Sequence, residues 1–143
     1  PRRTIRRRLG PPQLDIHPEI VRAGDILTVS VAFRPARAEV LSELVLLLQA
    51  TEVAARPSSE PDEPRIYRHS LHVERRVVDR NRLRLDGAHV TVIQEMFQIP
   101  ESAPPSFGAP HNELRWEVTA TVRTADLLTW KQSRRILVFP SSG

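Results

Sequence analysis

Strict alternation of apolar and polar side chains is the feature that most constrains the fold of this chain. A strand with one face in a core must be apolar at every second position. The clearest run spans residues 114–122, where Leu, Trp, Val, Ala and Val alternate with Arg, Glu and Thr. Residues 27–33 alternate in the same way, directly after the turn signal of residues 23–25. Several short runs of this kind predict an all-β protein.

Proline separates these runs more than glycine does. The 143 residues include 13 prolines, and proline belongs in connections or at sheet edges because it lacks a backbone donor. Residues 56–65 are acidic and proline-rich, so we expect an exposed loop there. The length suits one core. We therefore predict an antiparallel, immunoglobulin-like β-sandwich of about seven or eight strands, forming one domain over residues 13–143.

Two further runs have less regular patterns. Tyr67, Leu71, Val73 and Val77 share one parity, which predicts that this face of residues 67–77 points into the core. On the same parity lie His69 and Arg75.

In the next run, Ile93, Phe97 and Ile99 line one face, whereas residues 90 and 92 are valines of the opposite parity. That change of parity predicts a bulge or a change of sheet near Thr91. We expect a last short strand over residues 136–139.

Residues 38–53 favour two different structures. They are rich in helix formers, and their apolar positions fall at helical spacing. The neighbouring runs are all strands, however, and the segment LVLLL can form a central strand that is apolar on both faces. We interpret residues 38–53 as a strand, because tertiary context commonly overrides propensity.

The positive charge is concentrated at the start of the chain. The formal net charge is +4, with 21 basic and 17 acidic residues. Five of the basic residues lie within residues 1–12, which we interpret as a flexible arginine-rich leader: Arg2, Arg3, Arg6, Arg7 and Arg8. These arginines can bind the phosphates of nucleic acid or an anionic membrane surface. The alternatives are a solvated leader or the flank of a membrane helix upstream.

The sequence gives little support to catalysis or to a cofactor. It has no cysteine, which excludes disulfides, thiolate metal sites and a cysteine nucleophile. His69 and His72 differ in parity on a strand, so we expect them on opposite faces rather than around one metal. The five glycines are scattered singly and form no phosphate-binding loop. We therefore predict no catalytic residue, no cofactor and no metal site.

The two tryptophans have different expected roles. Trp116 lies on the inward parity of the best strand and is interpreted as core. Trp130 lies between two expected strands, where it either anchors a partner as an exposed aromatic or packs against the sandwich edge. A free sheet edge is a further candidate surface, because it can accept an extended peptide by strand addition.

Four stretches resemble the arrestin-like family in the order that the family has them. The most specific is IPESAPPSFGAPHNELRWEVTATV, residues 99–122, which is similar to the family's PPSF-type loop and the strand that follows it, with Trp116 where the pattern has tyrosine. RAGDILTVSV, LVLLLQATEV and DGAHVTVIQEMFQIP resemble three other strands of the family. The resemblance implies a single-lobe, bacterial-type arrestin-like sandwich that binds without catalysis. It does not carry over a phosphate sensor, since QLDIH offers no matching basic pair.

The expected function is a non-catalytic protein-interaction module, an adaptor or scaffold with a protein partner. The chain begins at Pro1 without a methionine, so we interpret it as a fragment or processed product, the soluble cytoplasmic part of a longer or membrane-attached protein. The alternative is anion or nucleic-acid binding through the N-terminal arginines, as in a shell or coat protein with a basic arm.

Overall fold

The computed structural model describes residues 8–56 and 65–141. Within these ranges the regular structure is almost entirely β, which confirms the predicted fold class. Ten strands are present, rather than seven or eight: β1 (Gln13–His17), β2 (Ile20–Arg22), β3 (Ile26–Phe33), β4 (Glu39–Arg56), β5 (Arg65–Val77), β6 (Arg84–Leu85), β7 (Thr91–Gln98), β8 (Phe107–Ala109), β9 (Asn112–Thr124) and β10 (Thr129–Phe139). A 3-10 turn, η1 (Arg80–Arg82), precedes β6. No helix in the described ranges is long and apolar enough to span a membrane.

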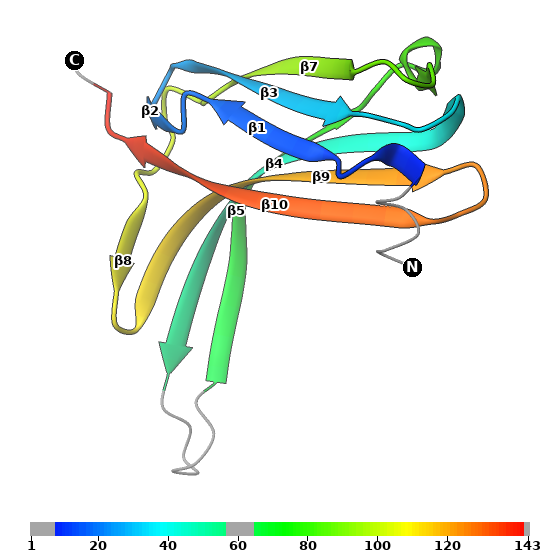
Figure 1. Cartoon of the computed structure of the whole chain (residues 1–143). Helices are drawn as coiled ribbons and strands as arrows, with labels where there is room; N and C mark the ends of the chain where they lie inside the picture. Colours follow the sequence, from blue (N-terminus) through cyan, green and yellow to red (C-terminus); the bar gives the residue numbers. More distant parts are fainter. Residues whose placement is uncertain (1–7, 57–64, 142–143) are drawn as a thin grey trace.

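The strands form two layers with the core between them (Figure 1). The small sheet has the order β1-β3-β7, and the large sheet has the order β2-β10-β9-β4-β5. Neighbouring strands run antiparallel, except that β2 runs parallel to β10. β6 pairs with one end of β4, and β8 pairs with β9. The result is a two-layered, mostly antiparallel β-sandwich.

The two most regular runs supply much of this core. In β3 and β9 every apolar residue of the predicted inward parity is buried: Leu27, Val29, Val31, Phe33, Leu114, Trp116, Val118, Ala120 and Val122. Ile93 and Phe97 of β7, beside β3 in the small sheet, and Ile99 directly after β7 are buried as well. The alternation therefore identified the core faces of these strands correctly.

The ambiguous segment of residues 38–53 is a strand, as predicted. β4 pairs with β5 along one edge and with β9 along the other, so both of its edges are hydrogen-bonded. Leu44, Leu46 and Leu48 are buried between the sheets, and Val45 and Leu47 are half-buried on the outer face of the large sheet. A leucine-rich run therefore suits a central strand here in spite of its helix propensity.

The predicted inward face of β5 is wrong. Val73 and Val77 are 54% and 56% exposed, and Tyr67 and Leu71 are exposed as well. In this part of β5 the opposite parity, which includes Arg76, points toward the small sheet. β5 is an edge strand with charged residues on both parities, so alternation alone does not show which parity is inward.

A bulge in β5 also overturns the expectation for the two histidines. The β4–β5 register shifts at Ala50/Thr51, and Leu71 has no partner in β4. His72 and His69 consequently lie opposite Ala50 and Glu52, two residues that share a face of β4. The histidines therefore lie on the same face of the sheet and not on opposite faces.

Two details of the later strands also differ from expectation. The register between β3 and β7 is continuous from Thr91 to Gln98, so there is no bulge or change of sheet near Thr91. Val92 is simply exposed on the outer face of the small sheet. The last strand begins at Thr129, well before residue 136, and Trp130 lies inside it.

The N-terminal leader is packed against the sandwich over its described part. Leu9 is fully buried, and its carbonyl oxygen accepts a hydrogen bond from the Arg34 backbone N–H at 3.0 Å. The expectation of a flexible leader is thus wrong for residues 8–12, and the domain begins no later than Arg8. Residues 1–7 and most of the expected loop at 56–65 lie outside the described residues.

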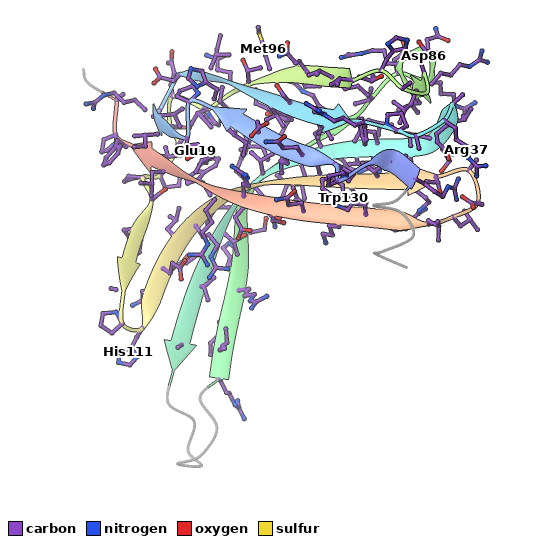
Figure 2. The ribbon with its side chains drawn as sticks, viewed as in Figure 1. Glu19, Arg37, Asp86, Met96, His111 and Trp130 are labelled. Carbon is purple, nitrogen blue, oxygen red and sulfur yellow. The ribbon has the colours of Figure 1, made fainter. Side chains whose placement is uncertain are left out.

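One end of the large sheet projects beyond the small sheet (Figure 1). We call this part the arm: residues 51–56 of β4, 65–70 of β5, 107–109 of β8 and 112–114 of β9. His111 marks the tip of its β8–β9 hairpin in Figure 2. Ile66, Tyr67 and Phe107 are about half exposed because no layer of the described chain covers them there.

Candidate functional site

Arg8 is engaged within the chain and does not offer a free positive charge. Its Nε and a terminal nitrogen donate to the two oxygens of Glu39 at 3.2 Å and 2.8 Å, and its other terminal nitrogen donates to Asp126. The Glu39 side chain is only 7% exposed. Hydrogen bonds from Arg8 lower the pKa of Glu39, and the same bonds raise the pKa of Arg8. The pKa of Asp126 is lowered by the Thr124 hydroxyl and then by Arg8.

Arg8 is therefore removed from the set of arginines that we expected to bind anions. Arg8 serves as an internal ion-pair partner that ties the N-terminal segment to β4. Arg2, Arg3, Arg6 and Arg7 lie outside the described residues, and for them anion binding stays a prediction.

Trp130 is not an exposed anchor. It is 5% exposed and lies opposite Val122 of β9, on the core side of β10, where Figure 2 labels it. Of the two alternatives, packing within the sandwich is the one that the structure shows. Trp116 is core as predicted, and its Nε1 donates to the Pro104 carbonyl at 2.9 Å. That bond ties the PPSF loop to β9.

The edge of the small sheet at β7 is closed by arginine side chains. The backbone carbonyls of Gln94 and Met96 accept hydrogen bonds from Arg82 and Arg76, respectively. Both arginines also pair with Glu95, at 2.9 Å for Arg82 and 3.8 Å for Arg76. Covered carbonyls cannot pair with another strand, so part of the β7 edge is blocked.

Arg76 has a second contact that explains its position. Its guanidinium lies over the buried Phe97 ring, 4.3 Å from the ring centre. Because residue 76 is on the inner parity of β5, its side chain reaches from the large sheet across to the small sheet. Arg76 therefore closes this side of the sandwich. The alternation of β5 had predicted that the parity of residue 76 faces outward.

The adjacent edge, at β5, is open. The Val78 N–H donates to the Leu44 carbonyl at 3.0 Å, which makes this a hydrogen-bonded antiparallel pair. Hydrogen-bonded and non-bonded pairs alternate, so the N–H and C=O groups of Val73, Arg75 and Val77 point away from β4. No other strand of the described chain pairs with β5.

The side chains along this open edge are apolar and basic. On the outer face, Val77 lies opposite Val45, and Arg75 lies opposite Leu47. Arg75 is 58% exposed, and its ion pair with Glu43 is long, at 3.4 Å. We call Val45, Leu47, Val73, Arg75 and Val77 the β5 edge patch. Exposed apolar side chains beside unpaired backbone are typical of an interaction site.

Sequence reasoning named a free sheet edge as a candidate but did not locate it. It assigned Val73, Arg75 and Val77 to the core. A usable signal was present, since residues 74–76 are Glu, Arg and Arg. Charges on both parities are typical of a strand that lies at an edge.

A cavity of about 370 Å³ lies between β8, β9 and β10, where the arm joins the sandwich. Phe107 and Leu114 form part of its wall. Its charged side chains already neutralise one another: Glu113 accepts from Arg115 at 2.9 Å and pairs with Arg135 at 3.2 Å. Arg115 is the main cause of the lowered pKa of Glu113, and Glu113 in turn raises the pKa of Arg115. The cavity therefore presents no unpaired acid or base for chemistry.

Over residues 8–56 and 65–141, no three histidine or acidic side chains gather closely enough to hold a metal ion.

Comparisons with known proteins support the fold. Comparison with protein-family models found no match, and comparison with curated proteins found none either. Among solved structures, the chain is similar to Spo0M, a sporulation control protein from Bacillus subtilis, with a TM-score of 0.63 and 13% identity. The match covers 91% of this chain and 49% of Spo0M, so the chain spans about half the length of that protein.

A second solved structure is a superoxide reductase (neelaredoxin) from Ignicoccus hospitalis, with 16% identity and coverage of 90% of this chain and 80% of that one. Its TM-score of 0.44 is too low to indicate a shared fold. Spo0M has an arrestin-like fold, and the likeness to it supports the same fold for this chain.

Proposed function

We propose that this domain is a non-catalytic protein-interaction module, an adaptor or scaffold that binds a partner through the β5 edge patch. The observation that carries the proposal is the open backbone edge at residues 73–77, flanked by exposed valines. An open edge strand with exposed apolar side chains on its outer face is a liability unless a partner covers it. The same molecule blocks its β7 edge with Arg76 and Arg82.

Two further observations support this proposal. The charged groups of the cavity beside β8 and of the Arg8 cluster are already engaged in ion pairs, which suits a scaffold better than an active site. In addition, Spo0M is named a sporulation control protein, and a role in control is compatible with a binding module.

Site-specific photo-crosslinking in the producing cells tests the proposal. A photoreactive residue in place of Val77 reports on the β5 edge patch, and the same residue in place of Lys131 is the matched control. Lys131 is also exposed on the outer face of the large sheet, but it lies on β10. We expect a discrete adduct from position 77 that is absent from position 131. Identical adduct patterns at the two positions would overturn the proposal.

A purified partner identified in this way should bind the domain directly. Val73→Pro should then weaken binding, because proline removes an outward-pointing N–H without removing a bond to β4. Unchanged binding by a folded Val73→Pro domain would argue that contact occurs elsewhere.

A further inference from the structure

We infer that the occupant of the β5 edge patch is an acidic, extended segment of a partner protein, which pairs with residues 73–77 as an added strand. This inference rests on the proposed function and specifies the chemistry of the partner. It follows from the backbone of β5, from the side chains of its outer face and from the charge of the strand as a whole.

The backbone of β5 favours an extended partner. Val73, Arg75 and Val77 direct N–H and C=O groups away from β4 at every second position. Only another extended chain presents complementary groups at that spacing. The β7 edge lies on the same side of the sandwich, but two of its carbonyls already accept hydrogen bonds from arginine side chains. An added strand should therefore pair with β5 rather than with β7.

The outer face specifies which side chains the partner presents. Residues directly opposite one another on paired strands share a face and interact. Val73, Arg75 and Val77 therefore match a segment with the pattern apolar, any, acidic, any, apolar. Val45 and Leu47 continue the apolar surface on β4. Arg75 is available for an acidic side chain because its present pair with Glu43 is long and exposed.

The inner face contributes less to recognition. Arg76 contacts Phe97, Glu95 and the Met96 carbonyl, and it also donates to the Glu74 carboxylate at 3.1 Å. These side chains already have partners, so they offer little to a new strand. The specificity should therefore depend on Arg75.

The charge of β5 favours an acidic partner over a second copy of this chain. β5 contains Arg65, Arg68, Arg75 and Arg76 against Glu74 alone. Suppose that two copies of this chain paired through β5 in an antiparallel register, with Val73 of each copy opposite Val77 of the other. Arg75 of one copy would then lie opposite Arg75 of the other. Like charges placed directly opposite one another are destabilising.

The probe is the capped heptapeptide TVTETVT, which reads the same in both directions and so fits either strand orientation. The controls are TVTKTVT, which reverses the central charge, and TVTTTVT, which removes it. Binding is measured by NMR titration of the isotope-labelled domain up to about 1 mM peptide, a concentration at which even a weak complex forms. We expect TVTETVT to shift the amide signals of residues 73–77 and to slow their hydrogen exchange. It should bind about 3- to 10-fold more tightly than TVTKTVT.

Arg75→Glu should reverse this preference, so that TVTKTVT binds more tightly than TVTETVT. The matched control is Lys131→Glu, which makes the same change of charge on the same face of the sheet but on β10. We expect it to leave the preference unchanged. Both positions are exposed, and an unchanged spectrum away from the substitution shows that the fold is intact.

Each outcome distinguishes the inference from the proposed function. Equal binding of the three peptides at β5 would overturn the acidic specificity but would still agree with the proposed interaction module. If no peptide perturbs β5 while photo-crosslinking still gives an adduct at position 77, strand addition by an acidic segment is wrong but the module stands. If no peptide perturbs β5 and position 77 gives no specific adduct, both the proposed function and the acidic-segment inference are wrong. Concentration-dependent dimerisation through β5 would make the occupant a second copy and overturn the inference.

Discussion

Replacing Arg8 with alanine is expected to destabilise the domain by about 2 to 3 kcal/mol. Removing one partner of a fully buried ion pair costs about 3–5 kcal/mol, because a buried charge is left without compensation. The Glu39 side chain is 7% exposed, but the Arg8 side chain is 22% exposed. Arg37 also stays 3.6 Å from the same carboxylate. Both features place the expected loss below that of a fully buried pair.

The effect should depend on pH in a defined direction. The pKa of Glu39 is lowered in the folded state, so its ion pairing stabilises the fold above the ordinary glutamate pKa. That stabilisation is lost as the pH falls through the lowered pKa. The difference in unfolding free energy between the wild type and Arg8→Ala should therefore be full at pH 7 and shrink below about pH 4.5, near the ordinary glutamate value.

Urea unfolding at several pH values measures these differences, and the melting temperature should fall by roughly 4 to 12 °C at neutral pH. Arg37→Ala is the matched control. It contacts the same carboxylate, but its side chain is 78% exposed, so we expect a loss below about 0.5 kcal/mol. If Arg8→Ala is no more destabilising than Arg37→Ala, or if its effect is the same at pH 3.5 and pH 7, the assignment of Arg8 as a structural residue is refuted.

Three further predictions follow from the same packing. Arg76→Ala should lower the free energy of unfolding by about 1–2 kcal/mol, because it uncovers Phe97 and frees a carbonyl on β7; a loss under 0.3 kcal/mol in urea would contradict this. Gly10→Ala should lower the melting temperature, since a Cβ at φ +70° would lie 2.5 Å from the Arg34 carbonyl oxygen; an unchanged melting temperature would contradict the packed N-terminal segment. Deleting residues 1–7 should abolish any salt-sensitive binding of DNA or RNA; binding that survives the deletion would exclude these arginines as the site.

The parts of the fold that the sequence predicted are those in which one strand face is plainly apolar and the other polar. β9 alternates without interruption through residues 114–122, so its parity has only one plausible assignment. β4 could be predicted only from its neighbours, because its own residues favour a helix. Pairing on both edges is a long-range property, and it decided the structure of this segment.

The parts that could not be predicted depend on contacts between residues distant in sequence. Arg8 meets Glu39 and Asp126, which lie 31 and 118 positions away, and a cluster of arginines shows nothing of those partners. In β5, the bulge at Leu71 reverses the parity partway along the strand. Alternation applies only where the register is continuous, so the faces of β5 and the relation between His69 and His72 were misassigned together.

The candidate site arises from the same two-residue period that builds the core. Arg75 and Arg76 are adjacent and chemically identical, yet they point to opposite faces of β5. Arg76 faces inward, reaches β7 and closes that edge, whereas Arg75 faces outward beside unpaired backbone. A register one residue different would exchange these roles, since Arg75 would cover Phe97 and Arg76 would stand on the open face. The bulge at Leu71 fixes the register of the residues beyond it, and it thereby separates the part of β5 that continues the sandwich from the part that enters the arm.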